Sequence, residues 1–376
     1  MSPDHEQIQR ARDLRPLIDA EAAEINRRRE LTPPVVRALK DGGFFRMLQP
    51  RSVGGMELKP IIFAQVTEAL AAADASVGWV VCQGNGCSMS AAYLAPEVAQ
   101  QMFGSVDGIL AWGPPGPYEA TPVPGGFRIT GTWRFASGSQ NATFLGAHIR
   151  IAGTGELRSF LFPKTSATMT DIWHTVGLRG TASNQYSVED LFVPEAFAMH
   201  RDDPRFRRET GLLYRFTSGQ LYSAGFAGVG LGIARGVIDA FRTLPANKTA
   251  RGAAKPMREN NVIQSQLAQS EARWQSARAF LHNTLIDIWD HVEKHGEMTV
   301  DHRTTLRLAS TWAIQQAREA VNTLYHAMGS VAVFEENPFE RRLRDMHTVA
   351  QQAQGRQLHF ETVGQHMLGL TPENQF

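Results

Sequence analysis

The first hundred residues repeat apolar positions with a helical period. The stretch "ALKDGGFFRML" ends one such segment at Gly42 and Gly43, because paired glycines disfavour continuation of a helix. The stretch "FAQVTEALAAADASVGWVVCQ" then carries a long apolar periodicity, with alanine where a neighbouring helix would approach closely. Residues 5–103 are therefore predicted to be helical.

From about residue 105 to 198 the pattern changes to short alternating or apolar runs. The runs "GGFRITGTWRFASGS", "ATFLGAHIRIAG", "RSFLFP" and "SVEDLFVP" are broken by Gly, Pro and Ser, which is typical of strands joined by turns. This part of the chain is predicted to form a β-domain.

A charged linker, "HRDDPRFRRETG", leads into a second helical pattern from about 212 to 368. Breaks fall near "LPANKTARGAAKPM", "KHGEM" and "GSVAVFEENPF", and long helices joined in this way favour an antiparallel bundle. The predicted fold is multidomain α+β: an N-terminal α-helical domain (1–104), a middle β-barrel or sandwich domain (105–205) and a C-terminal four-helix-bundle domain (206–376).

The composition and net charge argue against nucleic acids and membranes as partners. The formal net charge is +1 over 376 residues, which offers no electrostatic argument for binding nucleic acid or an anionic membrane. The sequence opens with no charged segment followed by an apolar core, and it contains no apolar run of about 18 residues. A cytoplasmic protein is expected. Cys82 and Cys87 lack the CxxC spacing and are expected to be buried free thiols.

Two further patterns resemble cofactor or metal motifs without their structural context. The glycines of "GFAGVGLGIARG" (225–236) lie within a helical pattern, whereas a dinucleotide fingerprint follows a strand and opens a helix. Close helix packing is the preferred interpretation of these glycines. The histidines of "HVEKHGEMTVDH" (291–302) flank a predicted loop at Gly296 in a solvent-facing charge pattern, so no metal site is expected.

Three strings, in this order, resemble the acyl-CoA dehydrogenase fold family. They are "GGFRITGTWRFASGS" (125–139), "VGLRGTASNQYSVEDLFVPE" (176–195) and "AMGSVAVFEENPFERRLRD" (327–345). The resemblance covers most of the chain. It implies noncovalently bound FAD or FMN between the β-domain and the bundles, and a homotetramer in which a neighbouring subunit completes the flavin site.

The first string carries the resemblance to a flavin-contacting strand. Phe135, Ala136 and Ser137 occupy the positions of the family's Trp-Ile-Thr segment, which implies a Ser137 hydroxyl near flavin N5. Without the resemblance, a serine followed by glycine in a strand is most simply a bulge or turn.

Other flavin contacts follow from the same resemblance, each with a structural alternative. Residues of "GLRGTAS" suit a polar flavin edge but also fit a β-turn with local hydrogen bonds. Two tryptophans offer platforms for an aromatic ring, although isolated tryptophans are more often core residues. The implied cofactor-binding residues are Trp112, Trp173, Arg179, Thr181 and Ser183, together with His326, Gly329 and Ser330 at the third string.

The catalytic base of an acyl-CoA dehydrogenase has no counterpart here. Counted forward from Arg344 and Asp345, which resemble the family's Arg-Asp, the usual glutamate falls on Ala353. The alternative location, ahead of the glycine-rich helix segment, falls on Tyr222. A neutral glutamine nearby has no basicity near pH 7 and cannot take the role.

The chain therefore looks like the two-component flavin-dependent monooxygenase branch of this fold. The resemblance implies reduced flavin supplied by a separate reductase, O2, a C4a-hydroperoxyflavin and hydroxylation of an aromatic or heteroaromatic small molecule. Aromatic residues in loops 112–124 and 200–218 favour a planar substrate. An acyl-CoA dehydrogenase-like oxidoreductase, an N-oxygenase on the same fold and a catalytically silent scaffold remain alternatives.

Related monooxygenases carry histidines at two positions that differ here. Gln352 stands at one of them, and Asn85 lies in the string "NGC" at the other. His347 precedes Gln352 by five residues, which is about 140° of rotation on a regular helix, so only one of the two would face a flavin. Gln352 is the preferred catalytic candidate, with His347 second, and Asn85 completes the set with Ser137.

Overall fold

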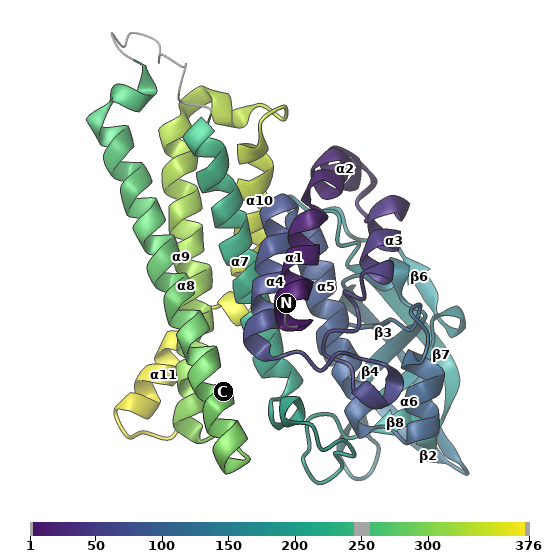
Figure 1. The fold of residues 1–376 in the computed structure, drawn as a ribbon. Helices are drawn as coiled ribbons and strands as arrows, with labels where there is room; N and C mark the ends of the chain where they lie inside the picture. The colour runs from purple at the N-terminus through teal and green to yellow at the C-terminus, as the bar shows by residue number, and fades with distance from the viewer. Residues whose placement is uncertain (1–2, 244–255, 373–376) are drawn as a thin grey trace.

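The computed structural model describes residues 3–243 and 256–372. N-terminal helices lie between a mixed β-sheet on one side and a bundle of long helices on the other (Figure 1). The N-terminal helices are α1 (Pro3–Asp13), α2 (Arg15–Arg28), α3 (Pro33–Asp41), α4 (Pro60–Ala73), α5 (Ala75–Ser88) and α6 (Pro96–Phe103). The fold class predicted from the sequence is confirmed.

The sheet has the strand order β6-β7-β3-β2-β4-β5-β8, with β1 paired to β4. β1 and β2 run parallel to β4, and the other pairs are antiparallel. Alternation of buried and exposed residues along β3 keeps one of its faces in the core. The strands are β1 (Leu110–Trp112), β2 (Glu119–Val123), β3 (Gly126–Ala136), β4 (Phe144–Ile151), β5 (Leu157–Pro163), β6 (Thr168–Thr170), β7 (Asn184–Pro194) and β8 (Ala198–Met199).

The described C-terminal residues form four bundle helices and a shorter helix, α11, that packs beside α9 (Figure 1). Asn260 caps the second long helix by accepting hydrogen bonds from Val262 and Ile263 N–H, and Thr299 forms a capping box with His302 at the third. The helices are α7 (Ser218–Thr243), α8 (Asn261–His295), α9 (Val300–Met328), α10 (Pro338–Gln351) and α11 (Leu358–Met367). Part of the predicted break "LPANKTARGAAKPM" lies outside the described residues.

Helix α7 packs against α4 at the glycines that resemble a dinucleotide motif. A Cβ added at Gly228 would lie 2.4 Å from the Ala64 carbonyl oxygen, and one at Gly232 would lie 2.3 Å from that of Glu68. Only glycine permits such an approach of two backbones. The interpretation of these glycines as helix-packing positions is confirmed. Within the described residues, α7 is also the one helix long and apolar enough to cross a membrane, but 89% of its apolar window is buried inside the protein.

One buried contact ties the bundle to the β-domain. The Leu178 N–H, in the loop between β6 and β7, donates to Asp345 Oδ1 of α10 over 2.6 Å. Burial raises the pKa of the Asp345 carboxyl to about 7, the like charge of Asp74 adds to this, and the Leu178 hydrogen bond and Arg341 oppose it. Asp345 therefore holds its proton in the folded protein well above the pH at which it ionises in the unfolded chain.

This shift predicts a pH-dependent stability. Between about pH 4 and 7 the unfolded state releases the Asp345 proton before the folded state does, so the free energy of unfolding falls as pH rises through this window. Asp345→Asn keeps an acceptor for Leu178 N–H but cannot ionise. It should stabilise the protein at pH 8 by about 1 kcal/mol or more, with a smaller gain at pH 5, in urea unfolding curves.

Asp345→Ala serves as the control, because it leaves the buried Leu178 amide without its acceptor and should destabilise at both pH values. Parallel pH profiles for wild type and Asp345→Asn would contradict the shift.

Candidate active site

A cavity of about 470 Å³ lies where the N-terminal helices, the β-domain and the end of α10 meet. Aromatic side chains form most of its apolar wall, and serine, glutamine, histidine and arginine side chains supply its polar groups. The lining residues are Trp79, Gln83, Trp112, Gly113, Pro114, Pro115, Phe135, Ser137, His148, Trp173, Leu178, Ser183, Arg201, Tyr222, Phe226, Thr348, Gln351, Gln352, Ala353, Gln354 and Arg356.

A bulge at the end of β3 aims Phe135 at this cavity. The pairing register with β7 shifts between Trp133 and Ala136, and Phe135 adopts a φ of 62°, which a bulky residue rarely does. Its ring is 57% exposed and meets Trp173 edge to face at 6.0 Å. Ala136 is fully buried behind it. The bulge therefore presents an exposed aromatic wall, and Ser137 and Gly138 form a turn directly after β3, as the structural alternative for this serine and glycine predicts.

A chain of hydroxyl groups begins at the cavity and runs into the loop before β7. The Trp79 indole N–H donates to Ser137 Oγ over 3.0 Å. The hydroxyl oxygens of Ser137 and Ser183 are 2.6 Å apart, and those of Ser183 and Thr181 are 2.7 Å apart. Thr181 Oγ1 donates to the Leu178 carbonyl over 2.9 Å. Ser137 and Ser183 thus act as one hydrogen-bonded unit.

Helices α5 and α7 form the opposite wall. Trp79 stacks on Phe226 with ring centroids 4.1 Å apart, and Tyr222 stacks on Phe226 at 5.7 Å. A Cβ added at Gly86 would lie 2.2 Å from the Tyr222 ring, so Gly86 makes room for the tyrosine. Burial raises the pKa of the Tyr222 phenol well above its ordinary value, and the side chain is neutral at pH 7.

His148 of β4 and Arg201 form a polar part of the cavity wall beside Trp112 of β1. The His148 ring meets Trp112 edge to face at 4.7 Å, and its Nδ1 lies 2.7 Å from Ser159 Oγ. Arg201 Nη1 lies 3.2 Å from His148 Nε2. Burial, followed by the charge of Arg201, lowers the His148 pKa well below 6.5, so His148 is neutral and accepts from Arg201.

The end of α10 closes the cavity. The helix stops at Gln351, and Gln352 has extended backbone angles, so the predicted regular helix through both His347 and Gln352 is wrong. Gln352 Oε1 accepts from Gln354 N–H over 2.7 Å and caps a 3₁₀ turn (Ala353–Gly355). Contacts from α9 hold this turn, including Gln315 Nε2 donating to the Gly355 carbonyl over 2.6 Å.

Both positions at which the resemblance places a dehydrogenase base line the cavity, and they hold Ala353 and Tyr222. Among all the lining residues there is no aspartate or glutamate. The described cavity wall therefore offers no carboxylate for abstracting a proton from carbon.

The structure separates the other predicted site residues into two groups. Six of them line the cavity, and Thr181 reaches it through Ser183. The six are Phe135, Ser137, Ser183, Trp112, Trp173 and Gln352. The residues outside the lining are Ala136, Asn85, Arg179, His347, His326, Gly329 and Ser330.

The contacts of this second group explain their placement. Asn85 donates to the Phe44 and Val81 carbonyls and accepts from Leu48 N–H. The exposed His347 lies 2.9 Å from Asn322 Oδ1. Arg179 donates to the Asn26 carbonyl. Their predicted roles, and those of the exposed residues at the end of α9, stay predictions.

Sequence reasoning missed Gln83, His148 and Arg201. Gln83 follows Trp79 by one helical turn, so helix periodicity pointed to it rather than to Asn85. His148 and Arg201 come together only through sheet pairing, because β5 lies between β4 and β8. No local signal joins them.

Within the described residues, no group of three or more His, Cys, Asp or Glu side chains is placed to hold a metal ion. The cavity does fit a flat aromatic ring with a polar edge. Phe135 and Trp173 offer apolar contact for such a ring, and the Ser137–Ser183 hydroxyls offer hydrogen bonds beside it. The residues present are therefore suited to a flavin ring.

Family models match two parts of the chain. The model described as acyl-CoA dehydrogenase, N-terminal domain, matches residues 3–103, and that described as acyl-CoA dehydrogenase, C-terminal domain, matches residues 224–356. The crystal structure of 3-HSA hydroxylase from Rhodococcus sp. RHA1 superposes with a TM-score of 0.91 at 23% identity, covering 98% of each chain. The architecture is that of the acyl-CoA dehydrogenase fold.

Sequence relatives place the chain more narrowly. It is 31% identical to an indole-3-acetate monooxygenase from Pseudomonas putida, over 94% of this chain and 91% of the relative. It is 25% identical to the flavin-dependent monooxygenase oxygenase subunit HsaA from Rhodococcus jostii (strain RHA1), over 90% and 92%. The chain belongs to the flavin-dependent monooxygenases of the acyl-CoA dehydrogenase family.

The two cysteines give a test of the wall behind Tyr222. Both are free and buried, as predicted, and Cys87 Sγ lies 3.2 Å from the Tyr222 hydroxyl. Burial raises the Cys87 pKa to about 12 and that of Cys82 well above 9. Native protein at pH 8 should therefore react with Ellman's reagent only as slowly as it unfolds, and denatured protein should release two equivalents. Rapid labelling of either thiol in the native state would contradict this packing.

Proposed function

We propose that this protein is the oxygenase component of a two-component system. It uses reduced FAD or FMN from a separate reductase, together with O2, to hydroxylate an aromatic or heteroaromatic small molecule. The observation that carries this proposal is the pair Ala353 and Tyr222: both face the cavity where a dehydrogenase needs its base. The named activities of the relatives support the same reaction class.

The flavin supplies the oxygen-activating chemistry when bound, which in the predicted route passes through a C4a-hydroperoxide. The protein residues have three tasks. Trp79, Tyr222 and Phe226 exclude water and orient a planar substrate. Gln352 presents a neutral amide. The Ser137 hydroxyl donates or accepts a hydrogen bond in the cavity, at the position that the resemblance places beside flavin N5.

The direction in which the hydroxyls of Ser137, Ser183 and Thr181 donate decides whether Ser137 is a donor or an acceptor toward the cavity. An indole N–H only donates and a carbonyl only accepts. With Thr181 donating to the Leu178 carbonyl, Ser183 must donate to Thr181, and Ser137 must donate to Ser183. Ser137 then faces the cavity as an acceptor.

Rotation of all three hydroxyls reverses this arrangement. Thr181 then donates to Ser183, Ser183 donates to Ser137, and the Ser137 hydrogen faces the cavity. The Leu178 carbonyl remains satisfied by the Trp173 indole N–H at 2.8 Å. The reversal therefore replaces the hydrogen bond from Thr181 to Leu178 with one from Ser137 to a group in the cavity. Ser137 can thus bond to a cavity atom that changes between donor and acceptor during the reaction.

Assembly as a homotetramer and a cytoplasmic location belong to the same proposal. Exposed apolar side chains at the C-terminal end, among them Met367, Leu368 and Leu370, together with Phe334 after α9, support contacts with other subunits. In the family such contacts would bring a second chain to the flavin near His326.

The reaction class is tested by offering both kinds of substrate. Mixed with a generic flavin reductase, NADH and a panel of phenols and indoles, the protein should convert at least one of them to a hydroxylated product. The flavin-loaded protein should not be bleached by acyl-CoA substrates under anaerobic conditions, because no carboxylate lines the described cavity to remove the α-proton. Rapid bleaching would establish a dehydrogenase instead.

The hydroxyl chain is tested by removing its first two members. Loss of one hydrogen bond to a buried polar group costs on the order of 1–3 kcal/mol, so Ser137→Ala should raise uncoupled H2O2 release by about tenfold. Ser183→Ala should have a smaller effect in the same direction, because Ser137 then loses its relay partner but not its own hydroxyl. Gln352→Ala should lower coupling as well.

Ser88→Ala is the matched control. Its hydroxyl is buried and donates to the Asn85 carbonyl, but it does not line the cavity. Coupling in this variant should equal that of wild type. If Ser137→Ala and Gln352→Ala also leave product yield and H2O2 release unchanged, neither residue takes part in the chemistry.

A further inference from the structure

The charged side chains that line the cavity are all positive. Two arginines, Arg201 and Arg356, line it, and no carboxylate does. The histidine in the wall, His148, is neutral because burial and the charge of Arg201 disfavour its protonated form. A ligand in this cavity therefore meets positive charge without a counterion in the wall, which favours an anion.

Arg201 is held in place by three contacts. Its Nη1 donates to His148 Nε2 at 3.2 Å, its guanidinium lies 5.1 Å from the centroid of the Trp112 ring, and its Nε is 3.6 Å from Asp202 Oδ2. Its side chain is 31% exposed, so it is fixed and partly removed from water.

The charge of Arg201 is only partly compensated. The Asp202 carboxylate accepts hydrogen bonds from Ser218 N–H at 2.9 Å and from Ser218 Oγ at 2.6 Å at the start of α7. Arg201 Nη2 donates no hydrogen bond to any of the described residues. Part of the guanidinium edge is therefore free for a further acceptor.

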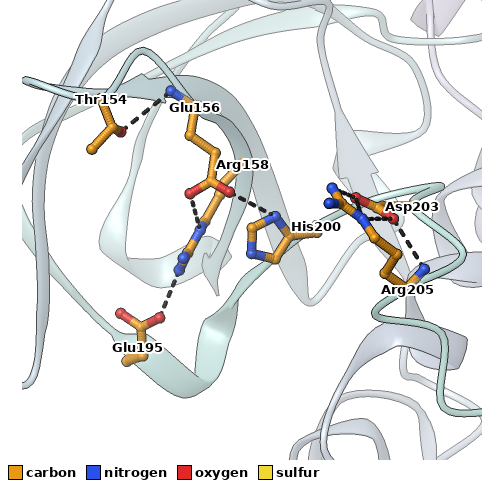
Figure 2. Close-up of polar contacts among 7 residues, drawn as sticks. All are labelled: Thr154, Glu156, Arg158, Glu195, His200, Asp203 and Arg205. Atoms are coloured by element: carbon orange, nitrogen blue, oxygen red, sulfur yellow. Dashed lines mark hydrogen bonds and ion pairs between the residues drawn. The ribbon is translucent and has the colours of Figure 1, made fainter.

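His200, the residue before Arg201, makes its contacts outside the cavity lining. Figure 2 shows His200 turned toward Glu156, to which its Nδ1 is 3.4 Å, with Arg158 bridging Glu156 and Glu195. His200 also stacks on Phe206 at 3.7 Å. Arg201 begins the turn that follows His200, and its side chain lines the cavity while the His200 ring is held by Glu156 and Phe206.

We propose that Arg201 recognises a carboxylate and that the substrate is a planar aromatic or heteroaromatic acid. The proposal rests on the proposed function and specifies its substrate class. A guanidinium matches a carboxylate in geometry and charge, and the aromatic side chains of Trp79, Trp112, Tyr222 and Phe226 give the ring its contacts. Arg356, which is exposed directly after the 3₁₀ turn Ala353–Gly355, is the less enclosed cation.

The experiment measures equilibrium binding rather than turnover. Flavin-loaded protein is titrated calorimetrically with three planar acids, indole-3-acetate, 4-hydroxyphenylacetate and 1-naphthylacetate, and with their uncharged amides. Wild type should bind at least one acid about tenfold or more tightly than its amide. Arg201→Gln should weaken binding of that acid by about 10- to 100-fold, the range for loss of a charge-assisted hydrogen bond, and change the amide less than about threefold.

Two further variants separate a specific contact from net charge and folding. Arg201→Lys keeps the charge but not the forked geometry, so binding of the acid should be intermediate. Arg205→Gln is the matched control: it lies in the same loop, its side chain is 81% exposed, and it pairs with Asp203 outside the cavity (Figure 2). Its affinity for the acid should equal that of wild type, and all variants should show wild-type thermal unfolding.

Three results would overturn the proposal. They are equal affinity of wild type for acids and amides, an equal loss for acid and amide in Arg201→Gln, and an equal loss in Arg205→Gln. If neutral phenols or indoles are hydroxylated while acids are not preferred, the carboxylate inference fails and the oxygenase function stands. If no aromatic compound is bound or hydroxylated, both fail.

Discussion

The hydrogen bonds of the Leu178 backbone hold the loop that carries the hydroxyl groups of the site. The Leu178 N–H is held by Asp345 of the bundle, and its carbonyl accepts from the Trp173 indole and the Thr181 hydroxyl. Leu178 has a φ of 51°, which a leucine adopts only where its surroundings enforce it. These bonds position the loop, the loop positions the hydroxyl chain, and the chain positions Ser137. A change in the bundle at Asp345 would reach the cavity by this route.

The amino-acid pattern predicts the helical parts of the architecture well because the main helices are long and periodic. The apolar repeat of α4 and the glycines of α7 report their mutual packing directly, since the two helices pack closely against each other at these glycines. The strand-rich middle part was likewise visible in short runs punctuated by Gly and Pro. The family resemblance added the flavin and the reaction class, which composition and periodicity do not contain.

The site was predicted less completely, for physical reasons that differ by residue. The end of α10 was misjudged because "VAQQAQGRQ" has good helix propensity, whereas tertiary contacts from Arg307 and Gln315 of α9 hold Gln354 and Gly355 in a 3₁₀ turn. Asn85 was chosen by counting from a motif, but its amide satisfies three backbone groups in the helical domain. Arg201 and His148 are distant in sequence, and only the order of strands in the sheet brings them together.

The close fit of Gly86 against the Tyr222 ring has a consequence for how such a pocket diversifies. Helices α5 and α7 approach one another closely, so this wall has little freedom to widen by moving its backbone. A larger residue at position 86 requires a smaller one at position 222, and the space available to a substrate changes only when the two change together. Among proteins that share this wall, these two positions should covary in volume, and their combined size should track the width of the ring that each one accepts.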